Sequence, residues 1–479
     1  MNVPSFEFLG FAAIAAVAFN LFQIAAWRQA VLLAANIIFF ATQMQGVVSC
    51  VPFLLFLVFG YVLMRFAQKT AADNNRLLFT ASLVAVVLVF AWLKKYGFFP
   101  SQVFLSFPYA TIGLSYVFFR VLHLVIDARG GTLPAITPLG YANYTLNFTA
   151  LISGPIQLYP DYKEQTDKLL RPDLVIFGRA IERIAIGFFK VFVLSHILHD
   201  MQGEALSLLP EAAGIWVVVV QGVIIAASYP LFLYCNFSGY TDVVIGVGYF
   251  FGLKLPENFN NPFIAENFIS FWGRWHMSLS NWLKTYVYYA LLMKLMERFP
   301  ARPIEPFLGV LAFFVTFFLV GIWHGQTSEF VMFGILQGGG VAVNKLYQIQ
   351  MVRRLGKKSY KALCAQPLYV IAARGLTFTW FTFTLFWFWS NWGQIGSYYA
   401  SLGWAGTLMV WGTLWVGASA VIEMVRRLWE LSLLVKAADR SLIRSRYTRT
   451  VSVTIIATLT TVFILLSNSP APDIVYKTF

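Results

Sequence analysis

Two tryptophan-rich stretches, FWGRWHMSLSNWLK at residues 271–284 and GIWHG at residues 321–325, organise this chain. The first contains His276 and the second His324, and the whole sequence has only 5 histidines. A long apolar run separates the two motifs. An ionisable side chain inside membrane-like sequence is costly and is a functional candidate by default. Residues 268–325 are therefore predicted to form the reactive centre of an integral membrane protein.

The composition is that of a chain whose surface faces lipid. Hydrophobic residues make up 59% of the sequence and charged residues only 12%, compared with about 25% charged residues in a soluble domain. The mean hydropathy is +0.69. At about 20 residues per span, the length of 479 residues predicts one all-α polytopic bundle of about twelve spans. The net charge of +14 is interpreted as cytoplasmic loops, not as a surface for nucleic acid.

Each predicted span is helical, because backbone hydrogen bonds cannot go unmade in hydrocarbon. The spans are expected at Phe6–Trp27, Val31–Thr42, Val51–Phe66, Leu77–Leu93, Val103–Ile126, Leu174–Leu198, Gly214–Tyr234, Ile304–Ile322, Phe330–Val343, Thr377–Trp389, Trp404–Met424 and Val451–Leu466. The basic segments Lys345–Arg374 and Arg426–Arg449 predict cytoplasmic loops and place both termini outside. Leu139–Tyr159, broken by Gly154-Pro155, predicts a re-entrant or kinked helix. Asn236–Phe263 predicts short helices and turns.

Residues 268–289 form an amphipathic pattern at helical spacing. The polar face carries Arg274, Ser278, Asn281, Lys284 and Thr285. Trp275 lies on the aromatic face, and His276 lies at its edge, pointing toward protein. Arg274 and Lys284 are candidates to attract an anionic donor such as phosphopantetheine, with a solvated face as the alternative. Ser278 and Asn281 are candidates to stabilise an oxyanion.

His324 is the candidate general base, because a neutral imidazole near pH 7 commonly fills this role. Trp323 precedes it, and Gly321 and Gly325 remove side-chain bulk, which predicts close approach of a substrate. The alternative is a buried histidine bonded to a carbonyl at a helix end. His276 either orients His324, binds an acyl carbonyl or serves structure alone.

The other polar residues carry weaker predictions. His123 is expected to be structural. His196 and His199, next to Asp200, do not make a convincing metal site, and no metal is predicted. Asp242 is expected to cap the next helix, with a catalytic acid as the alternative.

Five segments together resemble the membrane-bound O-acyltransferase superfamily in order and spacing. They are SGPI at Ser153–Ile156, NFSGYTD at Asn236–Asp242, PENFNNPF at Pro256–Phe263 and the two histidine motifs. The resemblance covers about residues 107–343 of a single predicted membrane domain, 1–479. It implies a helical bundle around a central funnel that narrows at His324, the family's principal catalytic position, with His276 as its usual companion.

Within this superfamily the chain is similar to the bacterial branch that contains the alginate O-acetylation and teichoic-acid D-alanyl transfer proteins. The resemblance implies transfer of an acyl group, acetyl favoured, from a cytoplasmic donor to hydroxyls of an exported envelope polysaccharide. D-alanyl transfer to a teichoic-acid-like polymer is the alternative, and residues 286–303, YVYYALLMKLMERFPARP, look more like that branch. A transporter or channel without acyl-transfer chemistry is a further alternative, although no internal repeat is visible.

The same resemblance implies the setting and the partners. The donor is expected to be an acyl-CoA or an acyl carrier protein thioester that docks on the basic loops or on the Arg274–Lys284 helix, with no resident cofactor. A periplasmic or extracellular transferase, or the polysaccharide itself, is expected to take the acyl group. The predicted location is the bacterial cytoplasmic (inner) membrane.

Overall fold

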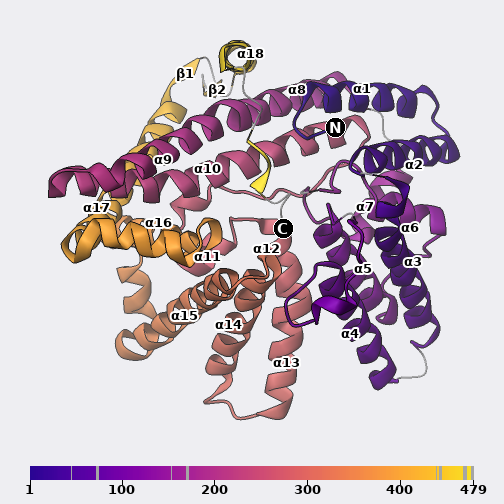
Figure 1. Cartoon of the computed structure of the whole chain (residues 1–479), viewed down its shortest axis with the longest axis horizontal. Coiled ribbons are helices and arrows are strands. Elements are labelled where there is room, and N and C mark those ends of the chain that lie inside the picture. The colour runs from indigo at the N-terminus through magenta and orange to yellow at the C-terminus, as the bar shows by residue number, and fades with distance from the viewer. Residues whose placement is uncertain are drawn as a thin grey trace. The chain divides into compact units, whose positions relative to one another are not determined.

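The computed structural model is almost entirely helical (Figure 1). It describes residues 1–44, 46–71, 75–109, 111–152, 154–168, 172–437, 440–441, 445–467 and 472–475. The helices are α1 (Phe6–Leu21), α2 (Ala25–Thr42), α3 (Val47–Lys69), α4 (Arg76–Leu93), α5 (Leu114–Arg129), α6 (Pro138–Thr145), α7 (Tyr159–Asp167), α8 (Leu174–Phe188), α9 (His196–Leu208), α10 (Ile215–Phe250), α11 (Phe268–Trp272), α12 (Met277–Leu283), α13 (Tyr289–Arg298), α14 (Glu305–His324), α15 (Ser328–Leu363), α16 (Pro367–Trp389), α17 (Trp392–Leu434) and α18 (Arg446–Ser467). Shorter elements are the 3-10 turns Ser101–Val103, Leu209–Glu211 and Pro262–Ile264, the π-helical turns Phe189–Ser195 and Lys284–Tyr288, and the antiparallel pair β1 (Lys436–Ala437) and β2 (Arg440–Ser441).

The chain divides into two compact units. The first comprises Met1–Val191, Phe237–Glu257 and Asp473–Phe479, and the second comprises Phe192–Asn236 and Asn258–Pro472. In the first unit, α5 packs against α3, α4 and α6. In the second unit, α14 and α15 run side by side, α15 also packs on α16, and α16 packs on α17 (Figure 1). Both histidine motifs belong to the second unit.

Eight of the described helices are long and apolar enough to cross a membrane. They are α2, α3, α4, α10, α14, α16, α17 and α18. The all-α polytopic architecture is therefore confirmed, but the expected count of about twelve spans is not. Helices α1 and α5 have 16 residues each. At 1.5 Å per residue that is about 24 Å, less than the roughly 30 Å hydrocarbon core.

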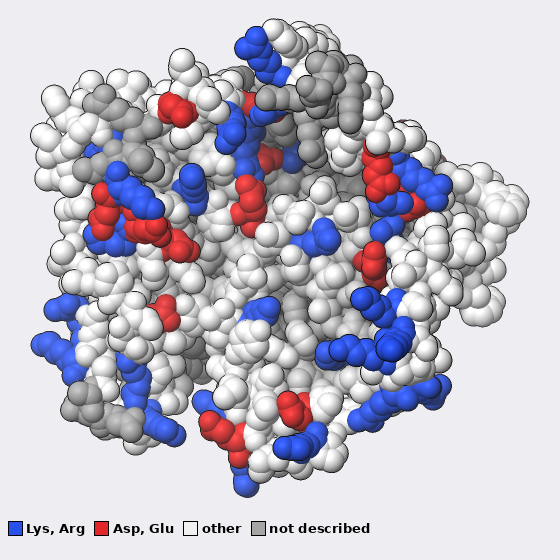
Figure 2. Space-filling model, turned by 180° about the vertical axis from the view of Figure 1, so that it is seen from behind, with Lys and Arg blue, Asp and Glu red and all other residues white. Residues whose placement is uncertain are grey.

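The outer faces of the long helices are apolar. Of the residues of α18, all of them described, Thr460 alone is buried, while Leu465 and Leu466 are 75% and 80% exposed. Figure 2 shows broad uncharged areas between scattered basic and acidic side chains on one face of the molecule. Apolar surface of this extent is unfavourable in water and is favourable against lipid. The lipid bilayer is therefore the medium of these helices.

The expectation of short helices and turns across Asn236–Phe263 was wrong for residues 236–250, which continue α10, and is confirmed for residues 251–263, which form turns that lead into a 3-10 turn. Gly239 of α10 meets Gly187 of α8, where a Cβ on Gly239 would lie 2.8 Å from the Gly187 carbonyl oxygen. Asp242 does not cap a helix. Its carboxylate accepts hydrogen bonds from Arg183 at 2.9 Å and from Lys190 at 2.7 Å. The polar residues that suggested a turn are thus satisfied along the side of a packed helix.

The broken helix predicted across residues 139–159 is present as α6, an irregular turn and α7. Arg120 of α5, only 2% exposed, donates hydrogen bonds to the carbonyl oxygens of Tyr144, Thr145 and Ala150 at 3.2, 2.8 and 2.6 Å. These bonds satisfy carbonyl groups that the end of α6 leaves without helical partners. A buried guanidinium thereby stabilises a non-helical segment inside the first unit.

Candidate active site

The segment that carries His276 is not the single amphipathic helix that we predicted. Helix α11 ends at Trp272, α12 begins at Met277, and His276 just before α12 has φ 43° and ψ 52°. These left-handed backbone angles are uncommon outside glycine and recur at functional sites. The π-helical turn Lys284–Tyr288 changes the helical phase again. The single continuous helix is therefore wrong, but most of the aromatic arc that the wheel predicted is buried: Phe268, Phe271, Trp272, Trp275, Leu279, Trp282 and Leu283.

Asn258 holds the break at His276 in place from a distant part of the sequence. Its carbonyl oxygen accepts the Met277 N–H at 2.9 Å. Its side-chain oxygen accepts the N–H of Ser278 at 3.2 Å and the hydroxyl of Ser278 at 2.6 Å. Two residues later, Asn260 and Arg274 exchange backbone and side-chain hydrogen bonds of 3.0 and 3.1 Å. The PENFNNPF and RWH motifs thus form one clamped structure.

The indole of Trp275 anchors this structure in a cluster of aromatic rings. Ring centroids 5.0 to 6.3 Å away belong to Tyr234, Phe259, Phe263, Phe271 and Phe381. His276 is 1% exposed, and burial lowers its pKa to about 3. The imidazole of His276 is therefore neutral at pH 7 and is a weak base, since general-base strength falls with pKa.

His324 is the last residue of α14 and is 3% exposed. Its ring centroid lies 4.6 Å from that of Trp323, 5.9 Å from that of Phe333 and 5.0 Å from that of Phe388. The contact with Phe388 is T-shaped, with an interplanar angle of 77°. Phe333 belongs to α15 and Phe388 to α16, so two neighbouring helices fix the orientation of the imidazole.

The two glycines beside His324 pack against α15, and this corrects the open approach that we expected there. A Cβ on Gly321 would lie 2.2 Å from the Cα of Gly334, and one on Gly325 would lie 2.1 Å from the ring of Phe330. Only glycine allows α14 and α15 to cross so closely. These glycines set the position of His324 through helix packing.

The same two helices, α15 and α16, also support the segment that carries His276. On α15, the Gln337 side chain accepts the Trp272 indole N–H at 3.2 Å and donates to the Thr384 hydroxyl at 2.8 Å. On α16, Phe381 contacts Trp275 at a centroid distance of 5.0 Å. Phe381 and Phe388 are seven residues apart, which is about 10 Å along one helix face. One scaffold therefore positions both histidine segments.

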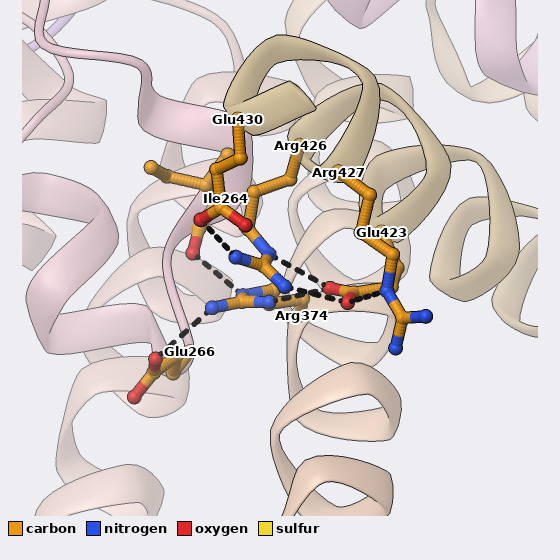
Figure 3. Close-up of polar contacts among 7 residues, drawn as sticks. All are labelled: Ile264, Glu266, Arg374, Glu423, Arg426, Arg427 and Glu430. Carbon is orange, nitrogen blue, oxygen red and sulfur yellow. Dashed lines mark hydrogen bonds and ion pairs between the residues drawn. The ribbon is translucent and has the colours of Figure 1, made fainter. Parts of the chain in front are cut away.

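Arg374 of α16 connects the segment that precedes α11 with helix α17 (Figure 3). Its guanidinium donates to the Ile264 carbonyl oxygen at 3.2 Å and contacts the carboxylates of Glu266 at 3.3 Å and Glu423 at 2.9 Å. Glu423, with a side chain 10% exposed, also accepts from Arg426 at 2.7 Å. Arg374 and Arg426, which we had placed on donor-docking loops, are thus engaged in an internal ion-pair network.

The other predicted site residues divide into two groups. Trp275, Ser278 and Trp323 are buried in the scaffold, and Arg274 is half-buried against Asn260. Asn281 and Lys284 are exposed, and the Lys284 ammonium lies over the Tyr289 ring at 5.8 Å. The Ser278 hydroxyl donates to Asn258, so it would have to leave that bond to stabilise an oxyanion.

A family model of the membrane-bound O-acyltransferases matches residues 123–388, which include both histidine motifs and the helices that support them. The chain belongs to the membrane-bound O-acyltransferase family. This match confirms the resemblance that the motifs indicated. The expectation of a single domain over residues 1–479 stays a prediction.

Relatives of this O-acyltransferase act on several envelope polymers. It is 29% identical to the teichoic acid D-alanyltransferase of Bacillus subtilis over 62% of this chain and 74% of that protein. It is 30% identical to the probable alginate O-acetylase of Azotobacter vinelandii over 50% of this chain and 45% of that protein. It is 32% identical to the peptidoglycan O-acetyltransferase of Helicobacter pylori over 44% of this chain and 38% of that protein. The match thus spans less than half of the two acetylating relatives, and the names of all three confirm the expectation of an acyltransferase.

Three residues important to the geometry of this O-acyltransferase carried no prediction of their own. Asn258 stood inside a motif that we used only for resemblance, and Gln337 and Phe388 lie in long apolar helices. For Asn258, the one sequence signal that could have indicated its role was an asparagine between two proline-containing turns. Ser153 of the SGPI motif lies outside the described residues.

Of the remaining histidines, His123 and His196 are hydrogen-bonded or ion-paired, and His199 lies 5.4 Å from the Phe232 ring. His123 contacts Asp127 through Nδ1 at 3.0 Å and the Tyr144 hydroxyl through Nε2 at 2.8 Å. His196 contacts Asp200 at 3.3 Å. In the part of the chain that the structure describes, no three His, Cys, Asp or Glu residues are grouped to hold a metal ion. The prediction of an enzyme without metal stays a prediction.

Proposed function

We propose that this O-acyltransferase moves an acetyl group from a cytoplasmic thioester donor to hydroxyl groups of an exported envelope polysaccharide. The observation that carries the proposal is the placement of His324 at the end of α14, buried and oriented by Phe333 and Phe388 within the family core. Relatives named for alginate and peptidoglycan O-acetylation support acetyl as the transferred group. D-alanyl transfer remains the second candidate, because the D-alanyltransferase of Bacillus subtilis shares the longest matched stretch of these relatives.

His324 acts as the general base in this proposal. Its imidazole takes the proton of the acceptor hydroxyl while the hydroxyl oxygen forms a bond to the thioester carbonyl carbon. The carbon–sulfur bond then breaks, and the departing thiolate receives the proton from the imidazolium. Proton transfer of this kind contributes roughly 10²- to 10⁴-fold to the rate.

His276 has a different part in this proposal. Because burial holds its pKa at about 3, it would be a poor base near neutral pH. A neutral imidazole can still donate or accept a hydrogen bond to an acyl carbonyl or to another side chain. The clamp from Asn258 gives that imidazole a defined position.

The donor, an acyl-CoA or an acyl carrier protein thioester, is proposed to dock on the cytoplasmic end of α15. Five exposed cations lie there without an intervening acid: Arg353, Arg354, Lys357, Lys358 and Lys361. Anionic phosphate or carrier carboxylates would be attracted to such a surface. This end is preferred over Arg374 and Arg426, whose guanidinium groups already pair with Glu423. The inner membrane is proposed as the location because of the family resemblance, and both termini are proposed to lie outside because of the charge of the basic segments.

Mass spectrometry of envelope polysaccharides tests the proposal in cells that carry the wild-type protein, the His324→Ala protein or no copy. We expect an acetyl mass to be lost from one polysaccharide in the last two strains. Loss of an alanyl mass would establish the D-alanyl alternative. An unchanged acyl content in the strain without the protein would contradict acyl transfer, and retained flux of an acyl species through His324→Ala would favour transport.

A further inference from the structure

The junction between α15 and α17 carries a tryptophan that is fixed at two points. Trp392 donates its indole N–H to the Ser328 hydroxyl at 2.8 Å. Its backbone N–H donates to the Glu329 carboxylate at 3.1 Å. Trp392 is nevertheless 46% exposed. A large aromatic surface is therefore held in a defined orientation while much of it stays uncovered.

This junction lies close to His324, the proposed base. The rings of His324 and Phe388 are in contact, and only a few residues separate each of them from the junction. The rings of His324 and Phe388 are 5.0 Å apart. Ser328 follows His324 by four residues, and Trp392 follows Phe388 by four residues. Four residues reach at most about 14 Å when fully extended. Trp392 and His324 therefore lie within the length of a short oligosaccharide of each other.

The surroundings of Trp392 suit a hydroxyl-rich ligand better than lipid. The exposed neighbours are polar and uncharged: Gln326, Thr327, Asn391 and Gln394. The bond to Ser328 occupies the polar edge of the indole. Trp387 meets the indole at 6.0 Å and 71°, which is T-shaped rather than stacked. An apolar ring face bordered by a few polar groups is the usual composition of a small-ligand site.

Glu329 gives this junction a negative charge. A hydrogen bond from Thr327 holds the pKa of the Glu329 carboxyl below its ordinary value. The carboxylate is therefore ionised at neutral pH and acts as a hydrogen-bond acceptor. It can accept hydrogen bonds from sugar hydroxyl groups, and it repels a phosphate.

We propose that Trp392, Ser328 and Glu329 form the subsite that holds a sugar ring of the acceptor polymer. The apolar C–H face of a pyranose would lie on the indole, and its hydroxyls would bond to the polar rim. This inference rests on the proposed function and adds where the acceptor binds and which class is preferred. A polyol-phosphate chain lacks such a ring face and carries the charge that Glu329 disfavours, so the subsite favours polysaccharide.

The experiment compares the wild-type protein in nanodiscs with Trp392→Leu, which keeps an apolar side chain but removes the ring. Trp404→Leu is the matched control, because Trp404 lies beyond the kink at Gly403 in α17 and is also exposed, at 79%. Calorimetry measures binding of an N-acetylglucosamine tetramer and of a glycerol-phosphate oligomer. The acyl-transfer rate at saturating tetramer is measured in parallel, together with thioester hydrolysis without acceptor.

We expect Trp392→Leu to weaken tetramer binding by roughly tenfold, as for loss of one aromatic contact. Trp404→Leu should bind the tetramer like the wild type and keep its rate of thioester hydrolysis, and Glu329→Gln should improve binding of the glycerol-phosphate oligomer. Equal binding by Trp392→Leu and Trp404→Leu would overturn the subsite and leave Trp392 as a membrane-interface anchor. Tighter binding of the glycerol-phosphate oligomer than of the tetramer by the wild-type protein would also overturn the subsite. Ring-dependent tetramer binding without any acyl transfer would support the subsite and refute the proposed function.

Discussion

The hydroxyl of Ser278 donates a 2.6 Å hydrogen bond to the side-chain oxygen of Asn258, and the N–H of Ser278 bonds to the same atom at 3.2 Å. Asn258 is 0% exposed, so leaving these groups without partners would carry a desolvation cost. His276 lies two residues before Ser278 and has left-handed backbone angles. This pair therefore fixes the backbone that presents the buried imidazole.

Replacing Asn258 should damage both stability and activity. Asn258→Ala removes the side-chain oxygen that accepts two buried hydrogen bonds from Ser278, which costs about 1–3 kcal/mol. We expect a lower unfolding temperature and a lower kcat, because His276 loses its fixed position. Asn260→Ala is the control, since Asn260 acts through its backbone groups in its contacts with Arg274. Equal behaviour of the two variants in thermal unfolding and in acyl transfer would refute the role of the Asn258 side chain.

The crossing of α14 and α15 should not tolerate a methyl group at Gly321. Gly321→Ala places a Cβ 2.2 Å from the Cα of Gly334. Forcing the helices apart costs typically 1–3 kcal/mol and shifts the end of α14 that carries His324. Gly339→Ala on α15 is the matched control, because a Cβ there meets nothing within 4 Å. Thermal unfolding in detergent should separate the two variants, and an unchanged midpoint for Gly321→Ala would contradict this packing.

The stability of the protein should fall as the pH is lowered, in part because of His276. The folded-state pKa of His276 is about 3, whereas an unfolded histidine has a pKa of about 6.5. Between these values the unfolded chain binds the proton and the folded chain does not. The contribution of His276 to the free energy of unfolding is therefore complete above about pH 6.5, and it is lost progressively as the pH falls toward 3. Unfolding followed by intrinsic fluorescence should show a weaker dependence below pH 6 for His276→Asn, a residue that also tolerates left-handed angles.

Replacing Arg374 should lower the stability of the protein more than replacing Arg427, whose side chain is exposed. Arg374→Met removes one of three guanidinium groups that contact Glu423, together with the donor to the Ile264 carbonyl oxygen and the contact with Glu266, so the loss should be about 1–3 kcal/mol. Arg427→Met removes a guanidinium whose side chain is 63% exposed, so the loss should stay below about 1 kcal/mol. Chemical denaturation measures both changes. A similar cost for the two variants would show that Arg374 does not hold the segment before α11 in place.

Composition and motifs were sufficient to predict the class of protein and that His276 points toward protein, whereas burial of His324 was only the alternative to an open approach. The all-α membrane architecture followed from the scarcity of charge, and the break between α6 and α7 followed from Gly154-Pro155. These features depend on local sequence and on the solvent, which a sequence reports directly.

The errors arose where distant residues change local structure. The polar tract at residues 236–242 looked like a turn, but Arg183 on α8 and Lys190 on the π-helical turn after it pair with Asp242 inside a helix. The single helix expected across residues 268–289 is interrupted at His276, where Asn258 bonds to the backbone, although the predicted aromatic face is buried. Gly321 resembled an opening for substrate, but Gly334 occupies that space. Packing partners of this kind leave no periodic pattern in the segment that they alter.

The rate of acyl transfer by purified His324→Gln, compared with the wild type and His276→Asn, tests the central claim most directly. The account predicts that His324→Gln lowers kcat by roughly 10²- to 10⁴-fold, the usual contribution of a general base. Its unfolding temperature should stay close to that of the wild type, and His276→Asn should lose less activity. A His324→Gln protein that transfers acyl groups at the wild-type rate would contradict the assignment of His324 as the base.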